Sequence, residues 1–278
     1  ESGVRKIGIP WDRAYEKVLD MIAYARLAEN AGFSIAHSAE DIRRMEQKGS
    51  ISGILTVEEG GVLNGRPERL DELYNSGIRL ITLTWNHGNC IGSPNSRERN
   101  EMETGLTPFG IETVERMNEL GMIVDVSHLS DGGFWDCVRY SKRPIAASHS
   151  NARVLCPHPR NLTDEMLRAL GQNGGIVGAN FYGAFLRLPG AGGKAAGRAD
   201  ITDIVRHIRH MMNVAGEDAV ALGTDFDGFD RDSLPKGIEG VQDMAVLWEA
   251  MRRAGFTERQ IEKIAYENVV RVLGECIG

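Results

Sequence analysis

Six short apolar runs recur along this sequence, separated by longer amphipathic stretches, and this alternation restricts the fold more than any other feature. Each run is almost continuously apolar, which is typical of strands buried on both faces of a parallel sheet. The repeated order of strand and helix predicts a parallel α/β protein, built either as a doubly wound sheet or as a barrel. The runs cover residues 53–57, 79–84, 122–127, 144–148, 175–180 and 219–224.

The stretches between the runs have the apolar spacing and the end signals of helices. Two acids follow Thr163, which suits the positive end of a helix, and Thr257 with Gln260 forms a capping-box pattern. Ser38 is a further candidate cap. The glycine-rich residues 189–197 are expected to form a flexible surface loop. The predicted helices cover residues 11–31, 38–45, 67–75, 107–120, 163–172, 201–214, 240–254 and 257–273.

Polar residues directly follow the apolar runs, and they decide between the two α/β folds. No G-x-G-x-x-G follows any run, so a dinucleotide-binding sheet loses its main support. In a barrel, the carboxyl ends of all strands converge on one face, where barrel enzymes place their chemistry. The sequence therefore favours a barrel with a site built from the strand ends, which carry Glu59, Trp85 with His87, His128, His149, Asn180 and Asp225.

These residue types match a site for a divalent metal. Two imidazoles with carboxylates suit zinc, which lowers the pKa of a bound water to about 7. A single histidine at a strand end is more often structural, but His128 and His149 follow neighbouring strands and accompany Glu59 and Asp225. We therefore predict that these histidines bind metal. His207 and His210 have a mixed packed and solvated surrounding and are predicted to be structural.

Several motifs resemble the membrane (renal) dipeptidase family of zinc metallopeptidases, in its bacterial type. They span roughly residues 50 to 270. The segments that carry the resemblance are Glu-Glu-Gly-Gly at 58–61, Leu-Thr-Trp-Asn at 83–86, Gly-Leu-Thr-Pro-Phe-Gly at 105–110, the run from 118 to His128, Ala-Ser-His-Ser at 147–150, Arg-Asn-Leu-Thr-Asp at 160–164 and Gly-Thr-Asp-Phe-Asp-Gly at 223–228.

The resemblance implies a role for each matching residue. Glu59 resembles the glutamate that bridges two zinc ions, and His128 and His149 resemble the ligands of the second zinc. Asp225 resembles the acid that handles the proton of the attacking water and helps to hold the substrate amine. Arg160 resembles the arginine that grips the peptide carbonyl or carboxylate. The implied activity is hydrolysis of dipeptides, including those with a D-residue at the C-terminal position.

The sequence departs from the family pattern in three ways that concern the site, one of which is Phe185, where some members carry a tyrosine on the substrate side. The family's first strand ends in His-x-Asp, which supplies the first zinc, and no His-x-Asp occurs here. Trp85 stands where many members have a histidine that contacts substrate, and His87 is a candidate replacement. With Asn180, these two residues are predicted to bind substrate. Two readings stay open beside the dipeptidase: a related amide or lactone hydrolase, and an inactive metal-binding relative.

We expect residues 1–278 to form a single (β/α)8 TIM-like barrel domain of the metal-dependent hydrolase type. One or two first strands are expected to be missing, because six runs were found where eight are needed. The net charge of −7 argues against nucleic acid as a partner. Four scattered cysteines and the lack of an apolar run of about 18 residues predict a cytoplasmic protein with no transmembrane segment. Family members often dimerise, so a homodimer is expected.

Overall fold

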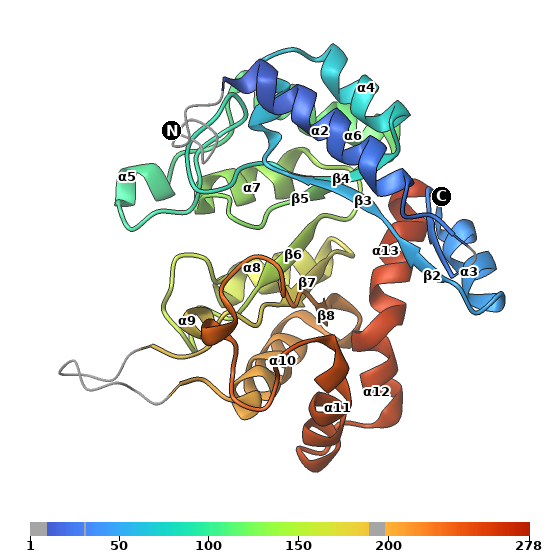
Figure 1. The fold of residues 1–278 in the computed structure, drawn as a ribbon. Helices are drawn as coiled ribbons and strands as arrows, with labels where there is room; N and C mark the ends of the chain where they lie inside the picture. Colours follow the sequence, from blue (N-terminus) through green and yellow to red (C-terminus); the bar gives the residue numbers. More distant parts are fainter. Residues whose placement is uncertain (1–9, 31, 189–197) are drawn as a thin grey trace. The chain divides into compact units, whose positions relative to one another are not determined.

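The computed structural model describes residues 10–30, 32–188 and 198–278 (Figure 1). These residues belong to two compact units. Unit 1 comprises residues 1–145 and 270–278, and unit 2 comprises residues 146–269. The loop predicted at 189–197 lies outside the described residues. In the part of the chain that the structure describes, no helix is both long enough and apolar enough to cross a bilayer.

Three parallel strands form the sheet of unit 1: β3 (Leu55–Glu58), β4 (Ile78–Thr82) and β5 (Ile123–Asp125). Ile81 lies opposite Val57 on one side and opposite Val124 on the other. All three side chains are buried. The first three strands expected from the sequence are therefore confirmed, although each is shorter than its apolar run.

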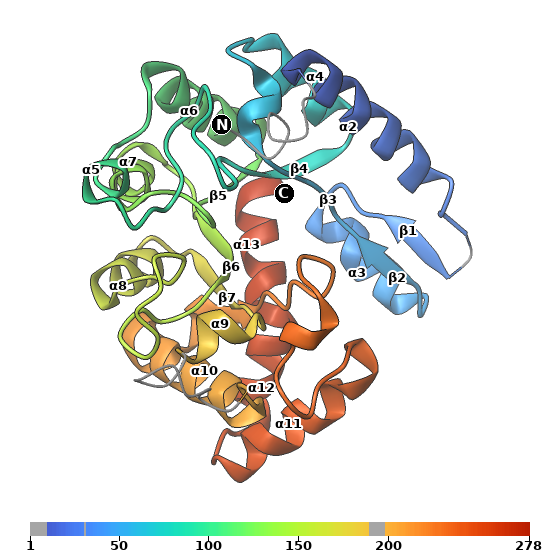
Figure 2. The same cartoon turned by 60° about the vertical axis from the view of Figure 1, so that its left-hand side comes forward.

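Unit 1 also contains a small parallel pair that the sequence did not predict. β1 (Phe33–Ile35) pairs with β2 (Ile51–Gly53), and α3 (Ala39–Gln47) connects them (Figure 2). Ser38 caps α3 by accepting from the backbone N–H of Asp41 (3.1 Å), as expected. The strands have only three residues each and are mostly half-exposed, so they lack the apolar run that marks the other strands.

The helices of unit 1 begin and end at recognisable local signals. Thr107 caps α6 by accepting from the backbone N–H of Gly110, and Gly121 ends it in a left-handed conformation. One long helix was not predicted, α7, because glycines near its start weaken the helical pattern. The helices of unit 1 are α2 (Trp11–Arg26), η1 (Gly60–Leu63), α4 (Glu68–Asn75), α5 (Arg99–Met102), α6 (Pro108–Leu120) and α7 (Asp131–Tyr140).

Unit 2 also contains three parallel strands, β6 (Ala146–Ser150), β7 (Ile176–Ala179) and β8 (Val220–Leu222). Val177 lies opposite Ala147 and also opposite Val220, and all three side chains are fully buried. The remaining three strands expected from the sequence are thereby confirmed.

Capping boxes start two helices of unit 2, one formed by Asp200 with Asp203 and one by Thr257 with Gln260. The helix predicted over 257–273 is instead three consecutive segments, since a π-helical turn interrupts it. The helices of unit 2 are α8 (Asp164–Gln172), α9 (Gly183–Leu186), α10 (Ile201–Ala215), η2 (Glu217–Ala219), η3 (Arg231–Ser233), η4 (Val241–Asp243), α11 (Met244–Arg253), α12 (Glu258–Glu262), η5 (Lys263–Glu267) and the start of α13 (Asn268–Ile277).

Candidate active site

Two glutamates stand at the end of β3. Glu58 is the last residue of the strand, and Glu59 caps η1 by accepting from the backbone N–H of Gly61 through Oε1 (2.9 Å). A Cβ at Gly61 would lie only 2.7 Å from this oxygen, so the close approach requires a glycine. Asn89 Nδ2 donates to the same oxygen at 2.6 Å. Glu59 is therefore held from two sides.

The second oxygen of Glu59 is the unusual one. The side chain is 7% exposed, and Oε2 has no hydrogen-bond partner among the residues that the structure describes. Burial raises the pKa of Glu59, although hydrogen bonds from the Asn89 side chain and from the backbone of Gly61 and Trp85 act to lower it. A buried carboxylate oxygen without a donor costs free energy unless a cation or ligand supplies the missing interaction. This side chain therefore fits the role of a metal ligand.

His128 follows β5 in unit 1. Its Nε2 lies 3.3 Å from Glu58 Oε1, so the carboxylate at ion-pair distance belongs to Glu58, which the sequence did not single out. The fully buried Asp125 supports the turn that leads to His128. Asp125 accepts from Thr82 Oγ1 (2.6 Å) and from the backbone N–H of Ser127 (3.1 Å). These contacts join two strands and the turn, which is a structural task.

The loop after β4 carries Trp85, His87 and Asn89. The Trp85 ring lies 6.4 Å from the His128 ring, centroid to centroid, and His87 is half-buried in the same loop. Asn89 was missed from the sequence. Its Nδ2 donates to Leu83 O (2.9 Å) as well as to Glu59. An asparagine inside a loop is common, so no signal in the sequence pointed to this contact.

His149 lies within β6 of unit 2 and is mostly buried. Ser148 Oγ lies 2.7 Å from its Nδ1. Arg160 Nη2 donates to the backbone oxygen of His149 (3.1 Å), and its Nη1 lies 3.5 Å from Ser150 Oγ. A Cβ at Gly223 would lie 2.8 Å from the His149 Cα, so glycine is needed for β8 to approach this point. The structure thus brings together two predicted site residues, His149 and Arg160.

Asn180 and Asp225 form a second predicted pair in unit 2. Asn180 follows β7 and is fully buried, and its Nδ2 donates to Asp225 Oδ2 (3.0 Å). The other end of the amide, Oδ1, accepts from the backbone N–H of Tyr182 (2.6 Å). This second bond fixes which way the amide points. Asn180 therefore presents a donor to Asp225 and holds that carboxylate in place.

Backbone conformation sets three of the predicted residues apart. Among the described residues, the non-glycine positions with positive φ are Glu59 (144°), Asn64 (50°), His128 (65°) and Asp225 (58°). Asn64 ends η1 in a left-handed conformation that suits asparagine. The other three each follow a strand. Such backbone conformations cost about 1–3 kcal/mol each and concentrate at functional sites.

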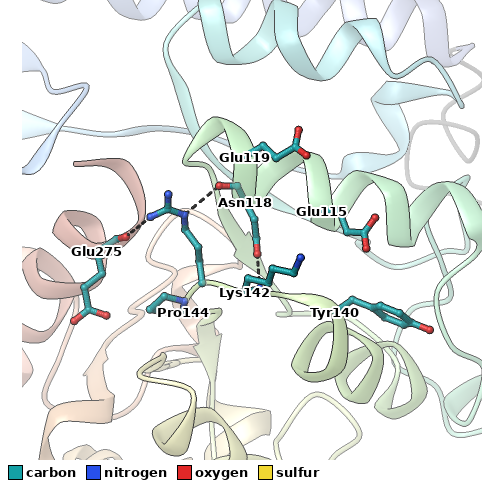
Figure 3. A pocket seen from close by; sticks show the side chains of 8 residues that line it. Glu115, Asn118, Glu119, Tyr140, Lys142, Pro144 and Glu275 are labelled. Atoms are coloured by element: carbon teal, nitrogen blue, oxygen red, sulfur yellow. Dashed lines mark hydrogen bonds between the residues drawn. The ribbon is translucent and has the colours of Figure 1, made fainter.

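A cavity of about 620 Å³ lies elsewhere in unit 1 (Figure 3). Asn118 joins its walls, because its Oδ1 accepts from the backbone N–H of Lys142 (2.5 Å) and its backbone oxygen accepts from Arg143 Nε (3.1 Å). Arg143 Nη1 also donates to Glu275 O (2.8 Å). None of the predicted site residues lines this cavity.

The chain is similar in sequence to several known proteins. An uncharacterized Klebsiella pneumoniae protein from the pqqA 5′ region is 39% identical over 251 residues, covering 89% of this chain and 90% of that protein. An uncharacterized dipeptidase of Schizosaccharomyces pombe is 36% identical over 249 residues, covering 87% of this chain. The chain spans only 58% of the length of this second relative.

Two solved structures are similar over almost the whole chain. One is dipeptidase AC, a metallo peptidase of family M19, with a TM-score of 0.87, 30% identity and coverage of 97% of this chain and 78% of that one. The other is a Rhodobacter sphaeroides metallo peptidase liganded with a phosphinate mimic of the dipeptide L-Ala-D-Ala. Its TM-score is 0.82 at 30% identity, with coverage of 92% of this chain and 72% of that one.

An amidohydrolase from Burkholderia multivorans, at 12% identity and a TM-score of 0.50, shares the fold alone. The chain therefore has the α/β fold of the amidohydrolase-type barrels. The model of the membrane dipeptidase family matches residues 12–276. The chain belongs to this family, peptidase family M19, and is a metal-dependent hydrolase of peptide bonds.

Proposed function

We propose that the protein is a zinc-dependent dipeptidase that accepts dipeptides with a D-residue at the C-terminal position. The observation that carries the proposal is Glu59, a buried carboxylate on a strained backbone with one oxygen that lacks a donor in the described part of the chain. The dipeptide as substrate class is supported by the Rhodobacter sphaeroides relative, which was solved with a mimic of L-Ala-D-Ala.

Glu59, His128 and His149 would hold the zinc ion. One carboxylate and two imidazoles are a donor set that zinc prefers. Ser148 Oγ at Nδ1 of His149 would fix the ring orientation, as partners of metal-binding histidines commonly do. Bound zinc supplies Lewis acidity and lowers the pKa of a water molecule. A second zinc of the family type would need a His-x-Asp, which this sequence does not contain.

Asp225 would accept the proton of the attacking water and pass it to the leaving amine. The hydrogen bond from Asn180 would hold the Asp225 carboxylate in position for this role. Arg160 would bind the substrate carboxylate or carbonyl, because a guanidinium pairs well with such oxygens. Trp85, His87 and Asn180 would contact the rest of the substrate.

A histidine substitution tests the ligand assignment. We expect His149→Ala to lose zinc and to lower turnover of L-Ala-D-Ala about 100-fold or more, since the reaction depends on the metal. His210→Ala is the matched control, because His210 lies in the same unit and contacts Asp164 (2.8 Å) rather than any proposed site residue. Zinc content by elemental analysis and hydrolysis rates are the measurements. Unchanged zinc and turnover in His149→Ala would contradict the assignment.

The substrate class needs a panel rather than one compound. Dipeptides with L- and D-residues should be cleaved, whereas simple amides and lactones should not. Cleavage of amides or lactones alone would favour a related hydrolase, and bound zinc without any hydrolysis would favour an inactive relative. We further propose that residues 1–278 act as a single domain. We also propose that the protein is a homodimer, and light scattering of the purified protein tests this oligomeric state.

A further inference from the structure

Asn161 joins two segments of unit 2 that flank the proposed substrate arginine. It is fully buried, in the loop between β6 and α8. Its Nδ2 donates to Cys156 O (2.8 Å) in its own loop and to Phe185 O (2.9 Å) in α9. Both amide hydrogens are therefore used, and they tie the loop to the helix that carries Phe185.

The acceptor end of the same amide is left unsatisfied. Asn161 Oδ1 is buried and has no hydrogen-bond partner among residues 10–30, 32–188 and 198–278. An unmade bond of this kind costs about 1–3 kcal/mol. A purely structural position would favour a residue without this cost. The presence of asparagine at position 161 is therefore best explained by the two hydrogen bonds that its amide donates, to Cys156 O and Phe185 O.

Phe185, which Asn161 holds by the backbone, packs against Arg160. The guanidinium carbon of Arg160 lies 5.4 Å from the centroid of the Phe185 ring. His158 closes the group, since its ring lies 4.6 Å from that of Phe185 and its Nδ1 accepts from the backbone N–H of Arg160 (3.2 Å). Arg160 is only 6% exposed, so these neighbours limit the directions in which its side chain can point.

We propose that Asn161 is a positioning residue that keeps Arg160 aimed at the substrate carboxylate by fixing Phe185 beside it. The inference rests on the proposed function, in which Arg160 grips that carboxylate. A displacement of about 1 Å in a positioning contact can cost up to about 100-fold in rate or binding. Loss of Asn161 should therefore weaken recognition of the carboxylate specifically.

The test compares a ligand that has the carboxylate with one that lacks it. The KM for L-Ala-D-Ala and the inhibition constant of L-Ala-D-Ala amide, used as a competitor, are measured for wild type, Asn161→Ala and Arg160→Ala. Asn268→Ala is the matched control. Asn268 is also buried in unit 2 and also donates to two backbone oxygens, Glu217 O and Val220 O (both 2.8 Å), but none of its contacts involves Arg160.

We expect Asn161→Ala to raise the KM for L-Ala-D-Ala about 10-fold, with kcat within about threefold and the amide's inhibition constant within about twofold. Arg160→Ala should raise the KM for the dipeptide by a larger factor, again with a smaller change in the amide's inhibition constant. Asn268→Ala should change neither quantity. If Asn161→Ala fails to fold, Phe185→Leu tests the same contact, because it leaves both hydrogen bonds of Asn161 in place.

The outcomes separate this inference from the function on which it rests. The positioning role alone would be overturned by one pattern of results. In this pattern, Asn161→Ala and Phe185→Leu change the KM of the dipeptide and the inhibition constant of its amide by the same factor, whereas Arg160→Ala still weakens binding of the dipeptide more than that of the amide. Absence of dipeptide turnover in the wild-type, zinc-loaded protein would overturn the proposed function and this inference together.

Discussion

At the scale of single residues, the candidate site is distinguished by interactions that cost free energy. Glu59 combines burial, a positive φ and an oxygen without a donor in the described residues, and each of these opposes folding. Asn89 offsets part of the cost by donating to Glu59 Oε1. Its own Oδ1 accepts from the backbone N–H of Ile91 (2.7 Å), which fixes the direction of the amide. The carboxylate is thus oriented before any ligand binds.

This arrangement predicts a role for Asn89 in metal affinity. Asn89→Ala should weaken zinc binding about 10- to 100-fold, because residues that orient a metal ligand typically contribute this much. Affinity is measured by competition with a chromogenic chelator. Asn118→Ala is the control, since Asn118 is a buried asparagine of the same unit that lines the separate cavity of Figure 3. Equal zinc affinity in the two variants would contradict the role.

At the scale of elements, a buried histidine connects α10 to two other segments of unit 2. His207 is fully buried. Its Nδ1 accepts from the backbone N–H of Ala152 (3.1 Å), and its Nε2 lies 3.1 Å from Leu186 O, to which it donates. The structural role predicted for this histidine agrees with these contacts. A ring that accepts at one nitrogen and donates at the other must be neutral.

The neutral state of His207 makes the stability of the fold depend on pH. Burial lowers the pKa of His207 from 6.5 to about 4, against the opposing effect of the bond to Leu186. The unfolded chain therefore takes up the proton first as pH falls. The contribution of His207 to the free energy of unfolding should be fully present above about pH 6.5. It should decrease by about 3 kcal/mol between pH 6.5 and pH 4 and level off below pH 4. Urea unfolding across this range measures the change.

The glutamine variant isolates the histidine from other titrating groups. His207→Gln has no ring to protonate, so its free energy of unfolding should fall less steeply between pH 6.5 and 4 than that of the wild type. Parallel curves for the two proteins would show that His207 does not titrate in this window.

Elements with local signals were predictable from the sequence, whereas those that depend on distant contacts were not. Ser38 and Thr257 accept the cap bonds expected of them, because a cap involves only residues three positions away. The β1–β2 pair was missed because each strand has only three residues and no continuous apolar run. α7 was missed because its glycines oppose helix formation and its buried side, which includes Phe134, is recognisable only after packing.

The same distinction, between local sequence signals and contacts of distant segments, applies to the candidate site. Strand-end position and residue type were sufficient to select His149, and the family resemblance selected Arg160. The structure brings these two residues into contact through the backbone of His149. The ion pair of Glu58 with His128 and the bond from Asn89 to Glu59 join different loops, so no local pattern encodes them. Positive φ at His128 is likewise set by the turn around it and could not be read from the sequence.

At the scale of the whole molecule, the proposed zinc ligands come from three strand ends that are far apart in the sequence. The unfolded chain does not hold Glu59, His128 and His149 together, so zinc should bind the folded state preferentially. Such binding stabilises the fold by an amount that depends on the ratio of free zinc to Kd, about 2.7 kcal/mol at a 100-fold excess over Kd. Under the proposed ligand assignment, zinc content should therefore determine stability as well as activity.

Removal of the metal should consequently lower the thermal stability of the protein. We expect treatment with a chelator to reduce Tm by about 5 °C or more, given about 2–4 °C per kcal/mol for a chain of this size, and zinc to restore it. Differential scanning calorimetry of the wild type and His149→Ala makes the comparison. The variant should respond weakly to zinc, because one proposed ligand is gone. A zinc response of equal size in both proteins would mean that the metal acts at another site.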